Sequence, residues 1–295
     1  MKKEIFRGAG VAIITPFTED GINFPELGRI IEDQIAGGTD AIVITGTTGE
    51  SATMTDEEHK AAIKFTVEQV KGRVPVVAGT GSNETAYAVQ LSQYAEQAGA
   101  DALLVVTPYY NKCTQKGLVR HFTAIADSVH IPIILYNVPS RTGVGIQPQT
   151  YAELAKHPNI AAVKEASGDF SNMLKTRKLC GDDLVFYSGN DDQIVPILSL
   201  GGSGVISVLS NIAPRQTHEI CQLYFEGKVK EASDKQVAYA DLIEALFCEV
   251  NPIPVKTAMR LLGYAAGPLR LPLCDMEEVH MEKLKQAMKA HGLLK

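Results

Sequence analysis

Short apolar stretches rich in Val and Ile recur along the 295-residue chain, and residues typical of turns follow each of them. Apolarity is continuous within each stretch, which favours strands covered on both faces, as in a parallel sheet. The spacing between stretches leaves room for a crossover helix after each strand. The eight stretches are GVAIITP from Gly10, DAIVITG from Asp40, VPVVAGT from Val74, ALLVVTP from Ala102, PIILYNV from Pro132, IAAVKEA from Ile160, LVFYSGN from Leu184 and GVISVLS from Gly204.

The segments between these strands have the pattern of helices. The clearest begins with a capping box at Thr55–Glu58 and stops at Gly72. Another is predicted from a Ser82-Asn83 cap to Gly99, a glycine suited to a left-handed helix end. Eight strand–helix units predict an α/β fold, a closed (β/α)8 TIM barrel. The alternative, a doubly wound sheet, lacks its glycine fingerprint, because Glu84 replaces the third glycine in GTGSNE.

The chain continues after the eighth strand for longer than one closing helix requires. Helical patterns occur near 215–227, 229–249 and 277–291, with Asn-Pro-Ile-Pro and Leu-Pro-Leu between them. We therefore predict a catalytic barrel over residues 1–226 and a small C-terminal helical appendage over 227–295.

Charge and cysteine content narrow the function classes. The formal net charge of -6 argues against nucleic acid or an anionic membrane as a partner. The apolar stretch from Val11 is interrupted by Pro16, and no run reaches the ~18 apolar residues of a membrane helix. The five cysteines form no CxxC pair, so we expect reduced, buried thiols in a cytoplasmic protein. The seven histidines show no metal-ligand spacing, and we expect no metal.

Catalytic side chains of a barrel lie at the carboxyl ends of its strands, and Lys164 is the only lysine within the eight apolar strands. Side chains alternate along a strand, so either Lys164 or Glu165 must face the barrel interior. A lysine buried there has a lowered pKa and can attack a carbonyl as the free amine. Pairing with a carboxylate, or extension to solvent, is the alternative for a lysine at a strand end. The strand pattern by itself leaves both open.

Two further strand ends carry groups suited to the same chemistry. Tyr136 interrupts an apolar run near the end of the preceding strand, so its phenol could move protons beside Lys164, or simply bond to backbone as a barrel aromatic. The loop Gly46-Thr47-Thr48-Gly49-Glu50 offers hydroxyls and consecutive N–H groups for a carboxylate. It lacks the Gly-Lys-Ser/Thr ending of a nucleotide-binding loop.

Together these segments resemble the pyruvate-dependent class I aldolase and lyase family typified by dihydrodipicolinate synthase and N-acetylneuraminate lyase. The resemblance covers nearly the whole chain. Its most specific motifs are GTTGES from Gly46, YNVPSRTG from Tyr136 and VKEASG from Val163; VTPYYN, GVISV and NPIPVK also match.

The resemblance implies a Schiff base between Lys164 and pyruvate, with no cofactor beyond this covalent imine. It further implies that Thr47 and Thr48 hold the pyruvate carboxylate. By the same resemblance Gly189 and Ile206 line the pyruvate pocket through backbone contacts.

Arg141 separates the branches of this family. It matches the arginine with which the synthase branch holds the carboxylate of aspartate semialdehyde, and a guanidinium suits a carboxylate because its fork is bidentate. The resemblance therefore implies condensation of pyruvate with L-aspartate 4-semialdehyde, the first committed step of diaminopimelate and lysine biosynthesis. The alternatives are an N-acetylneuraminate or sugar-acid aldolase, which would not need Arg141, and a non-catalytic barrel that binds a keto acid.

The resemblance also implies an oligomer and a pattern of regulation. In this family Tyr110 reaches across a subunit interface and joins Tyr136 and Thr47 in a proton relay, so we expect a homotetramer built as a dimer of dimers. In lysine-regulated members, the positions of Asp56 and Tyr87 carry histidine and glutamate. A phenol at position 87 supplies no charge for the ammonium group of lysine, so we expect weak or absent inhibition by lysine.

Overall fold

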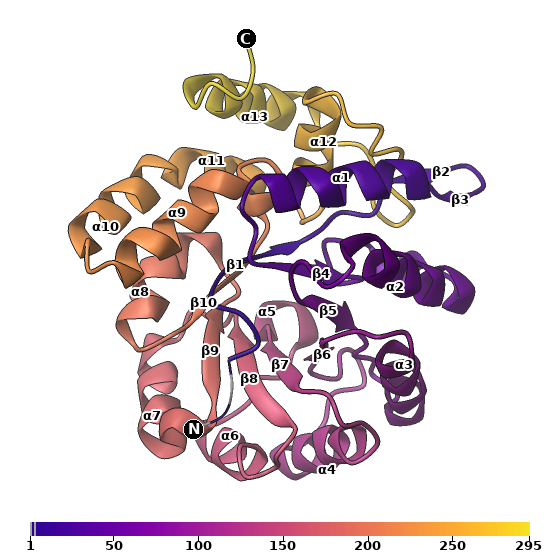
Figure 1. The fold of residues 1–295 in the computed structure, drawn as a ribbon, viewed down its shortest axis with the longest axis vertical. Coiled ribbons are helices and arrows are strands. Elements are labelled where there is room, and N and C mark those ends of the chain that lie inside the picture. The colour runs from indigo at the N-terminus through magenta and orange to yellow at the C-terminus, as the bar shows by residue number, and fades with distance from the viewer. Residues whose placement is uncertain (1, 3) are drawn as a thin grey trace.

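The computed structural model describes residue 2 and residues 4–295. The eight predicted strands form one closed barrel in which every neighbouring pair is parallel, in the order β1-β10-β9-β8-β7-β6-β5-β4. The predicted (β/α)8 fold is therefore confirmed (Figure 1). The barrel strands are β1 Gly8–Ala12, β4 Ala41–Ile44, β5 Val76–Gly79, β6 Ala102–Val106, β7 Ile133–Asn137, β8 Ile160–Glu165, β9 Val185–Ser188 and β10 Gly204–Ser207.

Helices surround the barrel, and their ends follow local capping chemistry. The predicted capping box is present, with Thr55 accepting from the Glu58 N–H and Glu58 accepting in return. The predicted Ser82-Asn83 cap is wrong: Glu84 is the N-cap, because its longer carboxylate accepts from the N–H groups of Ala86 and Tyr87. The surrounding helices are α1 Phe24–Ala36, α2 Asp56–Val70, α3 Thr85–Gln97, α4 Gln115–Ala126, α5 Pro139–Thr142, α6 Pro148–Leu154, α7 Phe170–Cys180, α8 Ile194–Ser199 and α9 Pro214–Phe225.

Two apolar layers hold this arrangement together. The larger lies between the strands and the helices, and the smaller fills the barrel itself. Inside the barrel Phe6 stacks on Tyr187 with ring centroids 4.3 Å apart, and the Tyr187 hydroxyl donates to the Phe6 carbonyl at 2.7 Å. Because this N-terminal segment fills the barrel interior, the opposite mouth at the carboxyl ends of the strands is left for a site.

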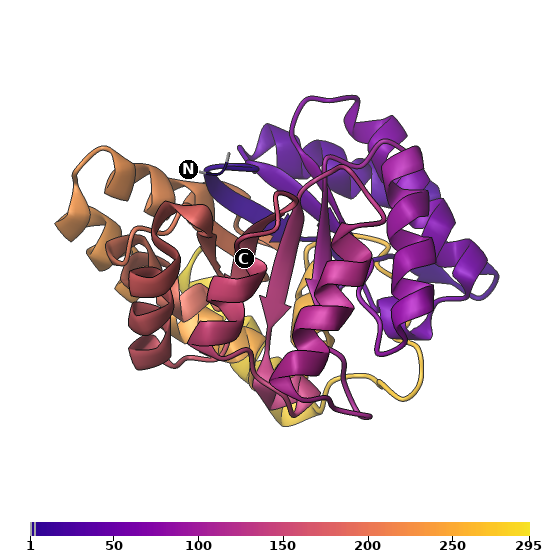
Figure 2. The ribbon, with the colours of Figure 1, turned by 90° about the horizontal axis from the view of Figure 1, so that it is seen from below.

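The C-terminal residues form four helices: α10 Val229–Ala238, α11 Ala240–Leu246, α12 Ile253–Leu261 and α13 Glu278–Ala290. The single helix expected over 229–249 is thus two helices, since Tyr239 leaves helical geometry between them. The helix α12 was not predicted, because Asn-Pro-Ile-Pro resembles a break. Pro252 is its N-cap and Pro254 falls in the first turn, where the missing N–H has no helical partner to lose. In Figure 2 the last two helices, α12 and α13 (yellow), lie toward the tips of the strand arrows, whereas α10 (orange) lies to the side.

The division into a barrel over 1–226 and an appendage over 227–295 stays a prediction. It falls in the turn between α9 and α10, and these two helices contact each other closely. A short hairpin of β2 Phe17–Thr18 and β3 Gly21–Ile22 precedes α1. Within the described part of the chain, every helix is too short or too polar to cross a membrane.

The five cysteines are all free, but the expectation of buried thiols is wrong for three of them. Cys180 and Cys221 are buried, Cys113 and Cys248 are half-buried, and Cys274 is exposed. The spacing of the histidines predicted no group of metal ligands, but the fold brings one together. His280 lies with Glu249 and Glu277, and their ligand atoms are all within 4.8 Å of one another. Glu249 Oε1 already accepts the Glu277 N–H and lies 2.7 Å from His280 Nδ1, so the cluster is satisfied internally.

Candidate active site

Lys164 and Tyr136 are direct partners in the register between β8 and β7. Strand alternation turns the Lys164 side chain into the barrel and Glu165 away from it. Lys164 is only 6% exposed, and its Nζ lies 4.3 Å from the centroid of the Tyr136 ring. The phenol and the amine therefore share one small region at the carboxyl end of the barrel.

Glu165 faces outward into the layer between strands and helices, where it is 3% exposed. Its carboxylate accepts from Tyr151 Oη at 3.0 Å, from Asn137 Nδ2 at 2.9 Å and from the Ser167 N–H at 2.9 Å. Burial raises the pKa of this carboxyl, and the hydrogen bonds act against that shift. The network joins the ends of β7 and β8, and so fixes the two strands that carry Tyr136 and Lys164.

A cavity of about 490 Å³ opens beside Tyr136 at the mouth of the barrel, and Lys164 is not among the residues that line it. Thr47, Tyr136 and Arg141 are among the residues that line it. Arg141 lies in α5, directly after the strand that carries Tyr136. Three of the predicted site residues, from two separate strand ends, therefore meet in one cavity.

Thr48 is buried and is held by Asn251, in the turn just before α12. Asn251 Nδ2 donates to Thr48 Oγ1 at 3.0 Å, and Arg141 Nη2 donates to the Asn251 carbonyl oxygen at 3.2 Å. The Asn251 Oδ1 atom is buried without a hydrogen-bond partner, and the residue lines the cavity. The sequence reasoning missed Asn251, although the NPIPVK motif that contains it was recognised.

Gly189 and Ile206 lie close to Lys164 and Tyr136, but neither lines the 490 Å³ cavity, so their contacts with pyruvate stay a prediction. A Cβ at Gly189 would meet the Ala166 Cβ at 2.7 Å and the Lys164 Cγ at 3.2 Å, so only glycine fits beside the lysine. Ile206 is 1% exposed and packs in the barrel interior with Tyr136.

Tyr110 is not brought to the other site residues within this chain. Its side chain is 91% exposed, and its backbone has a positive φ of 68°. The neighbouring Tyr109 lines the cavity instead. A phenol so far in solvent has no role in the site of its own chain.

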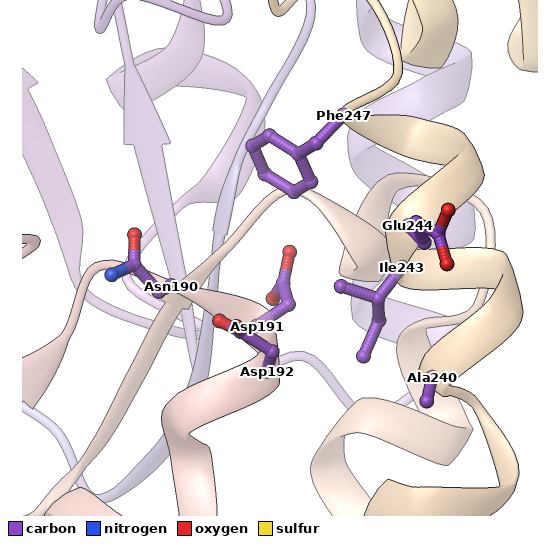
Figure 3. A pocket seen from close by; sticks show the side chains of 7 residues that line it. All are labelled: Asn190, Asp191, Asp192, Ala240, Ile243, Glu244 and Phe247. Atoms are coloured by element: carbon purple, nitrogen blue, oxygen red, sulfur yellow. The ribbon is translucent and has the colours of Figure 1, made fainter. Parts of the chain in front are cut away.

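A second cavity, of about 360 Å³, lies between the end of β9 and α11 (Figure 3). It is lined by residues of the SGNDD segment, and Figure 3 shows Asp191 between Asn190 and Ile243. Asp191 Oδ2 accepts the N–H groups of Val208 and Leu209 at 3.0 and 2.9 Å. Burial raises the pKa of Asp191. The carboxyl thus joins the loops that follow β9 and β10.

Of the two residues expected to decide lysine binding, Tyr87 lines the same 490 Å³ cavity, and Asp56 is its hydrogen-bond partner. Tyr87 Oη donates to Asp56 Oδ1 at 3.0 Å, and Lys60 Nζ lies 2.6 Å from Asp56 Oδ2. Asp56 therefore pairs with these two side chains, instead of with the backbone N–H groups of its own helix start. Burial raises the pKa of Tyr87 to about 12, so its phenol is neutral.

A closed (β/α)8 barrel with a buried lysine at the carboxyl end of a strand, next to a phenol, defines a class I aldolase-type lyase. Residues 5–291 match the dihydrodipicolinate synthetase family, and the chain belongs to that family.

The most similar relatives include two bacterial proteins and a solved structure. The chain is 59% identical over 292 residues to a 4-hydroxy-tetrahydrodipicolinate synthase of Thermoanaerobacter pseudethanolicus, covering 99% of this chain and 98% of that protein. It is 57% identical over 291 residues to the enzyme of that name from Clostridium perfringens strain 13, covering 99% of this chain and 100% of that one. The crystal structure of dihydrodipicolinate synthase from Aquifex aeolicus superposes with a TM-score of 0.96 at 44% identity, covering 98% of this chain and 99% of that chain.

Proposed function

We propose that this chain condenses pyruvate with L-aspartate 4-semialdehyde to 4-hydroxy-tetrahydrodipicolinate, through a Schiff base on Lys164. The single observation that carries the proposal is the buried Lys164 amine beside the Tyr136 ring at the mouth of the barrel. The names and identities of the relatives support the choice of substrates.

The first half of the reaction uses pyruvate alone. The Lys164 amine adds to the ketone carbon to give a carbinolamine, which loses water to form the imine. Tyr136 is placed to pass protons during addition and dehydration. Thr47 and Thr48, with their backbone N–H groups, would hold the carboxylate, while Gly189 leaves room for the backbone contact beside Lys164.

The second half begins when a methyl proton leaves the imine and gives an enamine. The enamine carbon attacks the aldehyde carbon of aspartate semialdehyde and forms the new carbon–carbon bond. The substrate amine then attacks the imine carbon, which closes the ring and releases the free Lys164. Arg141 would hold the carboxylate of the second substrate with N–H groups that its single bond to Asn251 leaves free. No step needs a metal or a cofactor.

The exposed Tyr110 supports a site that is completed by a second copy of the chain. A large aromatic side chain that is 91% exposed, on a backbone of positive φ, suits a subunit interface better than open solvent. In the assembly we propose, Tyr110 of each subunit joins Tyr136 and Thr47 of its partner, within a homotetramer. The proposed location of this biosynthetic enzyme is the cytoplasm.

Turnover with pyruvate and aspartate semialdehyde tests the proposal directly. Borohydride added with pyruvate should reduce an imine, and peptide mass spectrometry should place the adduct on Lys164. Lys256 serves as an internal control, because it is also a buried lysine. An adduct on Lys256, or turnover with N-acetylneuraminate instead of the two proposed substrates, would overturn the proposal.

A further inference from the structure

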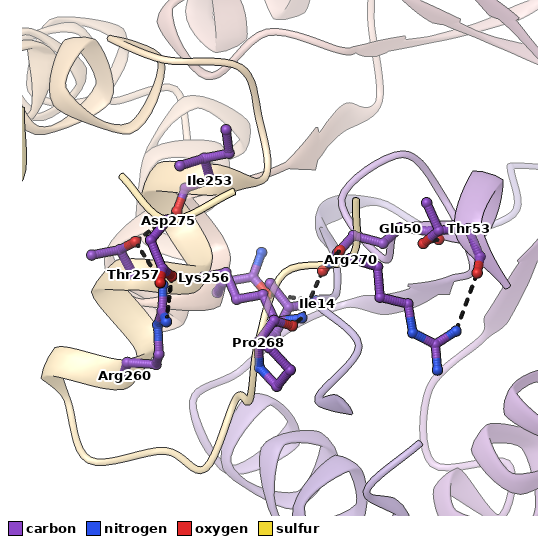
Figure 4. A network of polar contacts seen from close by, with 11 residues as sticks. Ile14, Glu50, Thr53, Ile253, Lys256, Thr257, Arg260, Pro268, Arg270 and Asp275 are labelled. Atoms are coloured by element: carbon purple, nitrogen blue, oxygen red, sulfur yellow. Dashed lines mark hydrogen bonds and ion pairs between the residues drawn. The ribbon is translucent and has the colours of Figure 1, made fainter. Parts of the chain in front are cut away.

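A buried ion pair links the C-terminal helices to the end of the GTTGES loop. Lys256 Nζ of α12 lies 2.6 Å from Glu50 Oε1, and the two side chains are 0% and 1% exposed. They are 206 residues apart in sequence. In Figure 4, Lys256 lies on the side of Thr257 and Arg260, and Glu50 lies beside Arg270 and Thr53.

Both members of the pair are enclosed by further contacts. Glu50 Oε2 accepts the Arg270 N–H at 3.1 Å, so each carboxylate oxygen has a donor. Lys256 Nζ also donates to the Pro268 carbonyl at 2.8 Å and lies 4.5 Å from the centroid of the Phe17 ring. The ammonium is therefore held by an ion pair, a carbonyl and an aromatic face at once.

Glu50 has a left-handed backbone, with φ of 57°. Residues other than glycine adopt this conformation reluctantly, so surrounding contacts must hold it in place. The residue comes directly after Thr47-Thr48-Gly49, and its N–H donates to the Thr47 carbonyl at 3.0 Å. Any shift of Glu50 is therefore transmitted to the two threonines.

Stability alone does not explain a charged pair at this place. Burying two charges costs free energy that their attraction often fails to recover, and apolar residues of similar size can be as stable. Burial lowers the pKa of Lys256 to about 8 despite the adjacent carboxylate. Burying the Lys256–Glu50 pair thus costs free energy that apolar side chains would not cost. We therefore look for its role in the position that it imposes on the loop.

We propose that Glu50 and Lys256 are positioning residues for pyruvate: the pair fixes the loop that presents Thr47 and Thr48 to the substrate carboxylate. Asn251 acts in the same direction, since it reaches Thr48 from the segment just before α12. The inference rests on the proposed function, because it assigns these threonines to pyruvate. It makes the C-terminal helices a part of the active site.

The experiment compares Glu50→Gln, Lys256→Met and the double variant by thermal unfolding and steady-state kinetics. Lys256→Met alone should unfold at the lowest temperature, because it leaves a buried carboxylate without its partner. The double variant, which carries both substitutions, removes both charges and should recover most of the lost unfolding temperature. Its KM for pyruvate should nevertheless rise about tenfold, whereas kcat and the KM for aspartate semialdehyde change less than about threefold, as expected for lost ground-state binding.

Leu284→Ala is the matched control, since Leu284 is fully buried in α13 and its truncation destabilises the same helices without touching Glu50. It should leave the KM for pyruvate unchanged. An equal rise of KM in this control, or an unchanged KM in a folded double variant, would show that the pair is merely structural.

If the double variant does not fold, Glu50→Gln, which keeps the shape of the side chain, tests the positioning role by itself. Its KM for pyruvate should rise more than about threefold at an unchanged kcat, and an unchanged KM would refute the positioning role. A wild-type protein that traps no pyruvate would refute the proposed function instead.

Discussion

Replacing Arg141 by alanine separates the two halves of the proposed reaction. In the structure the Arg141 side chain is exposed at the cavity and makes one protein hydrogen bond, from Nη2 to the Asn251 carbonyl at 3.2 Å. Among the described residues, no carboxylate lies within ion-pair distance of its guanidinium. The truncation therefore leaves no buried charge behind, and the free energy of unfolding should change by less than ~1 kcal/mol.

The expected loss is in the use of the second substrate. A hydrogen bond to a charged group contributes about 1.5–3 kcal/mol, and a bidentate contact with a carboxylate is of this kind. Its removal should lower kcat/KM for aspartate semialdehyde by roughly 10- to 150-fold. Borohydride trapping of pyruvate on Lys164 should stay within about twofold of wild type, because the imine forms before the second substrate reacts.

Two further variants make the result specific. Arg141→Lys keeps the charge but loses the planar fork, so its kcat/KM should fall between wild type and Arg141→Ala. Arg120→Ala removes an exposed arginine from α4, outside the residues that line the cavity, and should have no effect on either half-reaction. Equal loss of pyruvate trapping and turnover in Arg141→Ala would mean that Arg141 supports the structure of the site. Unimpaired turnover would favour a sugar-acid aldolase.

Three other predictions follow from the same site and its surroundings. Lys164→Ala should abolish both pyruvate trapping and turnover, and Lys164→Arg should do the same because a guanidinium is no nucleophile; residual trapping in either variant would assign the imine elsewhere. Lysine should inhibit turnover weakly or not at all, since the Tyr87 phenol supplies no charge for an ammonium and Asp56 already pairs with Tyr87 and Lys60; half-inhibition at submillimolar lysine would refute this. Burial lowers the pKa of His121 to about 4 from an unfolded value of 6.5, so the folded state favours the neutral ring. The contribution of His121 to the free energy of unfolding should therefore be fully present above pH 6.5 and fall by about 3 kcal/mol as the pH drops toward 4. Chemical denaturation at a series of pH values measures this free energy, and its dependence on pH should be flatter in His121→Gln. An unchanged pH dependence in that variant would exclude His121 as the source.

Local sequence patterns determined the barrel and the position of Lys164. Eight apolar runs of strand length, with room for a helix between them, leave few other topologies for a chain of this size. Within IAAVKEA, the alternation of side chains required that Lys164 and Glu165 face opposite ways, and the structure shows Lys164 inside. Tyr136 then lies beside it because consecutive strands of a barrel are neighbours.

Other features needed the folded chain. The cap at Glu84 depended on a rotamer choice among three polar residues in a row, which sequence does not rank. Two outward partners of Glu165 are distant in sequence: Asn137 on the neighbouring strand β7, and Tyr151, which reaches it only because α6 packs on the barrel. Tyr110 gave no local sign that it would be almost fully exposed.

The contacts between the C-terminal helices and the GTTGES loop are the clearest case of tertiary control. Asn251 reaches Thr48, and Lys256 reaches Glu50, each across more than two hundred residues of sequence. Hydrophobic periodicity fixes the face that a helix buries, but it carries no information on which distant loop that face will meet. That pairing is set by how α12 and the segment before it pack against the loop after β4, where the two buried charges become partners.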